Sequence, residues 1–148
     1  MKIRKGEYED LSRALELIEE LALYEKAPEE VTNTLEMMQE DGFGENPVFE
    51  FIVAEENGEI HGLSIFYWRY STWKGKRIYL EDLIVTESQR GAGIGKLLFD
   101  ETIAIGKASG ATGMMWQVLD WNEPAINFYK KYYNAGLESG WLNGRLDF

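Results

Sequence analysis

The sequence predicts one α/β domain with a mixed β-sheet flanked by helices. Apolar residues recur at helical spacing over residues 11–22 and again over 94–108. Three strand-like runs lie between these two helices, and the Asn57-Gly58 pair between the first two is typical of a hairpin turn, because both positions tolerate positive φ. A glycine-rich turn at 89–96 then joins the third run to the second of these helices. We find no linker, repeat or low-complexity tract, so a single domain over 1–148 is expected.

Each element follows from a local pattern. Residues 1–4 alternate as in an edge strand, Pro28 ends the first helical region, and Asp41-Gly42 ends a second helix that begins at 32–34. Lys74-Gly75-Lys76 turns the second strand into the third. The expected elements are strand 1–4, helices from 11 to 22 and from 32–34 to 42, strands 49–55, 60–69 and 77–85, helix 94–108, strand 112–119, helix 123–131 and strand 141–148. The predicted order is βααβββαβαβ.

Composition excludes several classes of function. Cysteine is absent and His61 is the only histidine, which removes disulfides, thiolate zinc sites, a cysteine nucleophile and multi-histidine metal clusters. We therefore expect no metal, and chemistry by carboxylates, tyrosines, backbone amides or a bound cofactor. A net charge of -11 disfavours nucleic acid and anionic membranes and attracts small cations, although an acidic surface also simply keeps a protein soluble.

Nothing in the sequence predicts membrane insertion. No apolar run approaches the roughly 20 residues that a spanning helix needs. The first six residues also lack the apolar stretch of a signal peptide. We expect a cytoplasmic protein.

The turn from Gln89 to Lys96 has the features of an anion cradle. Its glycines allow backbone N–H groups to approach a bound anion, and the following helix adds positive potential at its N-terminus. The turn lacks the Gly-Lys-Ser/Thr ending of a P-loop, and its glycine spacing differs from the dinucleotide fingerprint. NAD and ATP are therefore poor candidates. Three close glycines alone are more often a flexible turn.

Two adjacent carboxylates, Glu81 and Asp82, interrupt a strand that is otherwise apolar. Strand alternation predicts that they point to opposite faces of the sheet. A partly buried carboxylate has a raised pKa and can accept a proton near neutral pH. An amine substrate needs such a base, because its ammonium has a pKa near 10. We assign Glu81 as the candidate base, acting directly or through water, and Asp82 to the cationic substrate or a neighbouring strand; two solvated acids at a strand end are the alternative.

A short aromatic helix follows Asn122, the expected N-cap, with Pro124 in its first turn. On their own, Phe128 and Tyr129 would be ordinary core aromatics. A phenol with a pKa near 10 can nevertheless protonate a leaving thiolate whose parent thiol has a pKa of about 8.5.

Together these segments resemble the GCN5-related N-acetyltransferases (GNAT). Arg90-x-x-Gly93-x-Gly95 is similar to their pyrophosphate-binding signature, residues 122–129 are similar to their asparagine-x-x-alanine-x-x-phenylalanine-tyrosine run, and the predicted element order resembles their fold. The resemblance implies that acetyl-CoA is the co-substrate and that Tyr129 is the general acid. The cofactor-binding residues that it implies are Leu83, Ile84, Val85, Arg90, Gly91, Ala92, Gly93, Ile94, Gly95, Lys96, Asn122, Ala125, Phe128, Tyr129 and Lys131.

Within that superfamily, residues 40–44, 79–82, 90–91 and 120–124 resemble the diamine (spermidine/spermine) acetyltransferases. The resemblance implies a homodimer whose active sites draw residues from both chains. It assigns acceptor-binding roles to Tyr24, Glu25, Asp82 and Trp141. Aromatic faces and carboxylates suit a methylene chain that carries ammonium groups.

Two departures from the family pattern bear on specificity. Ser71-Thr72 stands where polyamine-acetylating members carry aspartate-proline, and this version is similar to the branch that acetylates thialysine, an amino-acid side-chain amine. Residues 131–137 also lack the usual glycine-alanine after the tyrosine helix. We expect an N-acetyltransferase for a thialysine-like amino acid or a di- or polyamine; an acetyl-CoA sensor or degenerate acetyltransferase without turnover is the alternative.

Overall fold

The structure, a computed structural model, describes residues 1–148. The chain divides into two compact units, Met1–Trp116 and Gln117–Phe148, and each is described by itself. The first unit contains β1 (Lys2–Lys5), α1 (Leu11–Tyr24), α2 (Leu35–Phe43), β2 (Glu50–Glu56), β3 (Glu59–Ser71), β4 (Gly75–Val85), α3 (Ile94–Ala108) and β5 (Met114–Met115), with 3-10 turns at Tyr8–Asp10, Pro28–Glu30 and Glu87–Gln89. The single-domain expectation stays a prediction.

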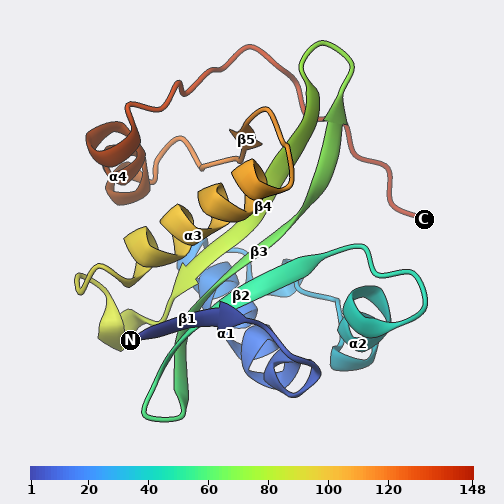
Figure 1. Ribbon diagram of the computed structural model, residues 1–148, viewed down its shortest axis with the longest axis vertical. Helices are drawn as coiled ribbons and strands as arrows, with labels where there is room; N and C mark the ends of the chain where they lie inside the picture. The colour runs from blue at the N-terminus through green and yellow to red at the C-terminus, as the bar shows by residue number, and fades with distance from the viewer. The chain divides into compact units, whose positions relative to one another are not determined.

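The first unit is built on a five-stranded sheet in the order β1-β2-β3-β4-β5 (Figure 1). Neighbouring strands are antiparallel except for β4 and β5, which are parallel. Asn57 and Gly58 have φ values of 53° and 79°, so the predicted hairpin turn between β2 and β3 is confirmed. The mixed, mostly antiparallel sheet predicted from the sequence is therefore present.

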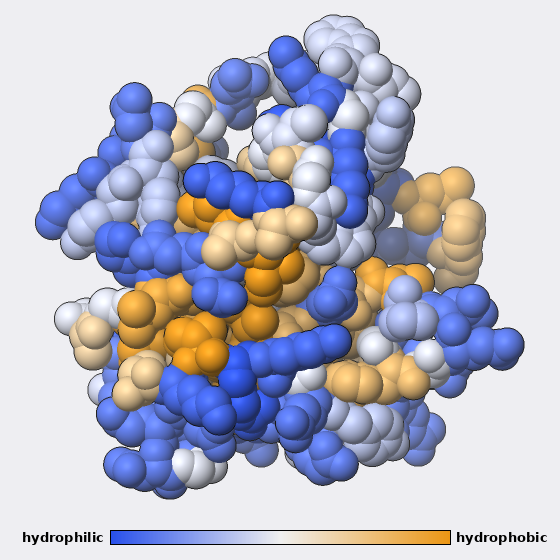
Figure 2. All heavy atoms as spheres, in the orientation of Figure 1, coloured by the Kyte–Doolittle hydropathy of each residue, from blue (hydrophilic) through white to orange (hydrophobic).

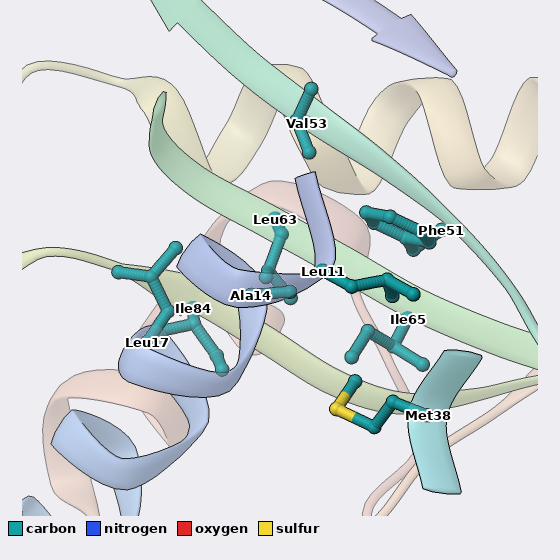
Figure 3. Close-up of a cluster of buried hydrophobic side chains, with 9 residues drawn as sticks. All are labelled: Leu11, Ala14, Leu17, Met38, Phe51, Val53, Leu63, Ile65 and Ile84. Atoms are coloured by element: carbon teal, nitrogen blue, oxygen red, sulfur yellow. The ribbon is translucent and has the colours of Figure 1, made fainter. Parts of the chain in front are cut away.

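One face of the sheet packs against α1 and α2. The apolar stripe of α1 supplies Leu11, Ala14 and Leu17, and α2 adds Met38. Alternate residues of the strands complete this cluster, and Figure 3 shows the side chains pointing toward one another. The strand residues are Phe51, Val53, Leu63, Ile65 and Ile84.

The other face of the sheet packs against α3, which Figure 1 shows lying across it. The alternate residues Ile52, Phe66 and Ile78 contact Ile94 and Leu98 there. Within this core the hydroxyls of Ser64 and Thr102 lie 2.7 Å apart, and Thr102 donates to the carbonyl of Leu98 at 2.8 Å. Burial without such a partner would cost free energy, so this hydrogen-bonded pair fixes the position of α3 on the sheet.

Figure 2 shows apolar side chains between α3 and β1 on this same face. They line a hollow with a volume of about 300 Å³. Its apolar residues include Ile3, Ile52, Phe66 and Ile105. The hollow lies on the side of the sheet away from α1.

The second unit contains α4 (Glu123–Tyr133). The Asn122 side chain accepts a hydrogen bond from the N–H of Ala125 at 3.4 Å, as predicted for an N-cap, and Asn134 ends the helix in the left-handed region. Nothing after α4 forms a helix or strand, so the strand predicted at 141–148 was wrong. Gly144 interrupts its apolar residues, and no strand pairs with the segment.

The strand predicted at 112–119 is also shorter than expected. Only Met114 and Met115 pair with β4, opposite Ile78 and Tyr79. The edge of β4 beyond Tyr79 therefore has no neighbouring strand on this side. No helix anywhere in the structure is both long enough and apolar enough to span a membrane.

Candidate active site

A β-bulge in β4 sets the geometry of the acidic pair. Ile65 of β3 lies opposite Asp82 and Phe66 lies opposite Leu80, so Glu81 is an extra residue without a partner across the ladder. The prediction that alternation sends the two carboxylates to opposite faces was wrong, because the extra residue breaks the period of two. Asp82 shares the face of Ile65, which packs against α1. Glu81 accepts a hydrogen bond from Tyr67, two residues from Ile65 on that same face.

The side chain of Asp82 is half-buried, and its carboxyl group has no hydrogen bond or ion pair within the chain. Burial raises its pKa to about 7, and the negative charges of Glu81 and Glu25 add to this effect. A buried carboxylate without a partner is costly to the folded state. Such a group is suited to a cationic ligand, which would supply the missing charge and hydrogen bonds.

Glu25 follows directly after α1, where it ends the helix, and burial raises its pKa. Its effect on Asp82 indicates that the two carboxyl groups are close in space. Tyr24, the last residue of α1, stacks against the guanidinium of Arg90, with 5.0 Å between the Arg90 Cζ and the ring centroid. The structure thus brings together three of the four predicted acceptor residues, Tyr24, Glu25 and Asp82, at the C-terminal end of α1.

Beside the acids lies a group of aromatic residues that the sequence reasoning missed. The rings of Tyr67 and Tyr79 stack with centroids 5.2 Å apart, and the Tyr67 hydroxyl donates to Glu81 Oε2 at 3.0 Å. Burial, followed by the charge of Glu81, raises the pKa of Tyr67 to about 12. Glu81 itself is exposed, so its carboxylate is accessible to solvent. The hydrogen bond from Tyr67 nevertheless holds the carboxylate in place. The sequence signal that could have indicated this group is the presence of Tyr67 and Tyr79 on adjacent predicted strands.

The end of β4 presents an open edge. Leu83, Ile84 and Val85 pair with β3 on one side, while β5 pairs with β4 only at Ile78 and Tyr79. An extended ligand can therefore lie along the unpaired side and hydrogen-bond to the backbone, as the resemblance implies for the pantetheine arm. The Val85 carbonyl already accepts a hydrogen bond from Arg90 Nε at 3.1 Å.

The glycine turn after β4 fits an anionic group. Gly91 and Gly93 have φ values of 85° and 83°, which are left-handed conformations that glycine adopts without strain. A Cβ added at either position would meet no atom within 4 Å, so the space beside the turn is open. Gly93 is the N-cap of α3 and has no side chain to cap it. The N-terminal N–H groups of the helix can therefore bind a diphosphate, as expected for Arg90, Gly91, Ala92, Gly93, Ile94, Gly95 and Lys96.

Glu20 of α1 holds the start of this turn in place. Its carboxylate accepts from the N–H of Glu87 at 2.7 Å and from the Thr86 hydroxyl at 3.1 Å. The contact spans more than 60 residues of sequence, and nothing in the local pattern around Glu20 signals it. Through Glu20 and Tyr24, α1 contacts the start of the glycine turn, and Glu25, directly after the helix, lies close to Asp82.

The remaining predicted residues belong to the second unit. Asn122, Ala125, Phe128 and Tyr129 lie at the start and along α4, and Tyr129 is 7% exposed. Lys131 lies in the last turn of α4, with its ammonium 5.0 Å from the ring centroid of Tyr132. Trp141 lies in the segment after α4 and is 83% exposed.

Comparison with known proteins identifies the family. The model of the acetyltransferase (GNAT) family matches residues 11–134. The chain belongs to the GNAT family. Mouse thialysine N-epsilon-acetyltransferase is 35% identical over 99% of this chain and 92% of the mouse protein. The pig protein of the same name is 38% identical over 98% of this chain and 91% of its own length.

Solved structures agree with this assignment. A mutant form of a Bacillus halodurans protein is 25% identical, covers 99% of both chains and superposes with a TM-score of 0.78. An aminoglycoside acetyltransferase from an uncultured soil metagenomic sample has the same fold at 21% identity, with a TM-score of 0.81 over 99% of this chain and 96% of its own. The GNAT fold predicted from the sequence is confirmed. The chain is an N-acetyltransferase, and its family uses acetyl-CoA as the acetyl donor.

The open turn leads to a first prediction. Gly93→Val should raise the KM for acetyl-CoA roughly tenfold or more, because the side chain would fill the space beside the α3 N-terminus and disturb hydrogen bonds to a charged group. Steady-state kinetics at saturating amine would measure this. Gly110→Val is a matched control, since Gly110 has a φ of 82° and open space but lies beyond the other end of α3. An unchanged KM in folded Gly93→Val would contradict the assignment.

Proposed function

We propose that the chain transfers the acetyl group of acetyl-CoA to the primary amine of a small cationic acceptor, a thialysine-like amino acid or a di- or polyamine, by direct attack in a ternary complex. The observation that carries this proposal is the half-buried carboxyl group of Asp82, which has no partner in the chain and lies beside Glu25 and Glu81. An ammonium ion is the ligand that this arrangement lacks. The names of the similar mouse and pig proteins support an amino-acid amine.

In the proposed mechanism Asp82 and Glu25 hold the acceptor as an ammonium ion, and Tyr24, next to Glu25, provides an aromatic face near the ammonium. Glu81 removes one proton from the ammonium, directly or through a water molecule, because its carboxylate is accessible. The hydrogen bond from Tyr67 orients the Glu81 carboxylate while leaving its other oxygen available.

The neutral amine attacks the thioester carbonyl, and the thioester supplies the acetyl group. Tyr129 then donates its phenolic proton to the sulfur as the C–S bond breaks, and the nitrogen gives up its second proton to the resulting phenolate or to water, which leaves a neutral amide. Its burial supports this role, since a proton donor shielded from water delivers its proton to the leaving group. The backbone of Leu83, Ile84 and Val85 and the turn from Arg90 to Lys96 would hold the donor in place.

We further propose that the enzyme is a homodimer, as the resemblance implies. Figure 1 shows the β3–β4 hairpin reaching beyond the rest of the first unit, and Trp73 at its tip is 88% exposed. The Ser71 hydroxyl accepts from the N–H groups of Trp73 and Lys74, so it stabilises this tip. In the sheet register Ser71 pairs with Gly75, six residues before Glu81. Ser71 is therefore remote from its own acidic pair and would act on the site of a second chain.

The decisive experiment is release of free thiol from acetyl-CoA, measured against thialysine, lysine, spermidine and short diamines. Amine-dependent release, with mass spectrometry of the acetylated product, is the expected result. Tight binding of acetyl-CoA without turnover on any amine would instead identify a sensor or degenerate acetyltransferase.

Substrate preference gives a second prediction. We expect kcat/KM to favour thialysine over spermidine, and Ser71→Asp to move the ratio toward spermidine by about threefold to tenfold, the effect of one partly exposed carboxylate near a second ammonium. An aspartate can keep the turn hydrogen bonds that Ser71 makes, so the hairpin should remain folded. Ser71→Asn is the uncharged control. A wild-type enzyme that prefers spermidine would show that Ser71 does not set specificity.

A further inference from the structure

Arg69 is a cation without a charged partner at the edge of the acidic site. It lies on β3, is exposed, and forms no hydrogen bond or ion pair within the chain. Its guanidinium lies over the ring of Tyr79, with 5.3 Å between Cζ and the ring centroid. The chain has only 15 lysines and arginines against 26 acids, so an arginine that makes no ion pair is unexpected from charge alone.

The sheet places Arg69 on the same face as the acids. It lies two residues after Tyr67, whose hydroxyl donates to Glu81, and alternation keeps these two side chains on one side of β3. The charge of Arg69 acts on the phenol groups of both Tyr67 and Tyr79 and opposes the rise in their pKa values. The tyrosine pair is therefore bounded by carboxylates at one end and by a guanidinium at the other.

The spacing matches a zwitterionic acceptor. Tyr79, under the guanidinium, lies two residues before Glu81, an interval of about 7 Å along a strand. In an extended lysine-like amino acid, six single bonds separate the terminal nitrogen from the carboxylate carbon, a distance of about 7–8 Å. An amine held at Asp82 and Glu81 would thus place the carboxylate of the same molecule within reach of Arg69.

We propose that Arg69 determines specificity by binding the α-carboxylate of an amino-acid acceptor whose terminal amine lies at the acidic pair. The planar guanidinium can donate two parallel hydrogen bonds to a carboxylate, and the stacked tyrosines give the intervening methylene chain an apolar surface. The same positive charge would repel the second ammonium of a diamine that extends in this direction. This inference rests on the proposed function and names the acceptor as an amino acid.

The test compares lysine with lysinamide, which differ only in the carboxylate. Arg69→Gln should lower the ratio of kcat/KM for lysine over lysinamide about fivefold to thirtyfold, the effect of losing a hydrogen-bonded charge at a partly exposed site. Most of the change should fall on the lysine KM, because the carboxylate is remote from the reacting nitrogen. The KM for acetyl-CoA should stay constant.

Lys76→Gln is the matched control. It removes one positive charge from the same hairpin. The Lys76 ammonium, however, lies on the face of the sheet that packs against α3. There it is 4.4 Å from the ring centroid of Trp68 and donates to the carbonyl of Ser109, directly after α3. If the ratio of kcat/KM for lysine over lysinamide is the same in wild type, Arg69→Gln and Lys76→Gln, the inference is overturned and the proposed function is left intact. Equal losses in both variants would also overturn it, because they would reflect net charge. Acetyl transfer by the wild-type enzyme to spermidine and short diamines but not to lysine would overturn the inference alone, whereas absence of transfer to thialysine, lysine, spermidine and short diamines would overturn the proposed function itself.

Discussion

Tyr129→Phe is expected to lower kcat roughly ten- to a thousandfold with little change in the affinity for acetyl-CoA. The range is that of lost general acid catalysis. Without the phenolic proton, the departing sulfur must leave as a thiolate or take a proton from water. The ring itself is retained, and since Tyr129 is only 7% exposed, its packing should change little. The loss should therefore appear in the chemical step, with kcat and kcat/KM falling together.

Steady-state kinetics and direct titration of acetyl-CoA binding would measure the two quantities separately. Tyr132→Phe is the matched control, because it removes a hydroxyl from an exposed tyrosine of the same helix. Pre-steady-state measurements would add a further test, since a slowed chemical step removes any burst of thiol release. Turnover at the wild-type rate in Tyr129→Phe would remove this residue from the mechanism.

Much of the fold could be predicted because its signals are local. The apolar stripe of α1 appears in the sequence as Leu11, Ala14 and Leu17, and the structure buries all three. The hairpin at Asn57-Gly58 follows from backbone preferences of two adjacent residues. The glycine turn and the cap at Asn122 were predictable for the same reason. Each of these features depends on a few neighbouring residues and elementary backbone chemistry.

The bulge at Glu81 could not be predicted from the pattern of β4 alone. A bulge is a property of the register between two strands, and here it depends on how Ile65 and Phe66 align with Asp82 and Leu80. Its consequence for function is large. One extra residue moves Glu81 onto the face of Asp82, so that the two acids share a site with Glu25. Alternation would have placed Glu81 on the opposite face, away from Asp82 and Glu25.

Long-range polar contacts account for the rest of what the sequence did not reveal. Glu20 reaches the turn after β4, and Arg69 lies over Tyr79 of the next strand. Both residues occupy exposed or half-buried positions that carry no periodic signal. The failed prediction at 141–148 has a different cause. A strand needs a neighbour to pair with, and local apolar content cannot supply one.

Asp82→Asn should stabilise the protein above neutral pH while damaging its activity. Burial raises the pKa of Asp82 to about 7, well above the usual value of about 3.9. Between these two values the folded protein keeps a proton that the unfolded chain has lost, so unfolding releases a proton. The contribution of protonated Asp82 to the free energy of unfolding is therefore largest below about pH 4, and it is lost as the pH rises through about 7. At pH 8 the asparagine variant should be more stable by at most about 4 kcal/mol.

Urea unfolding between pH 5 and 8 would measure this difference. Subtracting the stability curve of Asp82→Asn from that of wild type isolates the contribution of Asp82. Other groups also change stability with pH. The hydrogen bond from Arg4 lowers the pKa of Asp10, so the stability from Asp10 is lost as the pH falls. Asp41→Asn, an exposed position in α2, is the control and should leave the curve unchanged. The free energy of unfolding of wild type should fall relative to that of Asp82→Asn as the pH rises. If it does not, the carboxylate of Asp82 is not shielded and unpartnered in the folded protein.

The kinetic half of the same prediction links this instability to function. In wild type, kcat/KM for the amine should rise as the pH increases through about 7, because only the carboxylate form of Asp82 binds an ammonium strongly. Asp82→Asn should lower kcat/KM roughly ten- to a hundredfold, with an unchanged KM for acetyl-CoA. Bound amine should in turn stabilise wild type above pH 7 and leave the variant almost unaffected. The cost of the unpaired carboxylate to the folded enzyme would then be offset by its substrate, which is the expected behaviour of a binding group and not of a structural one.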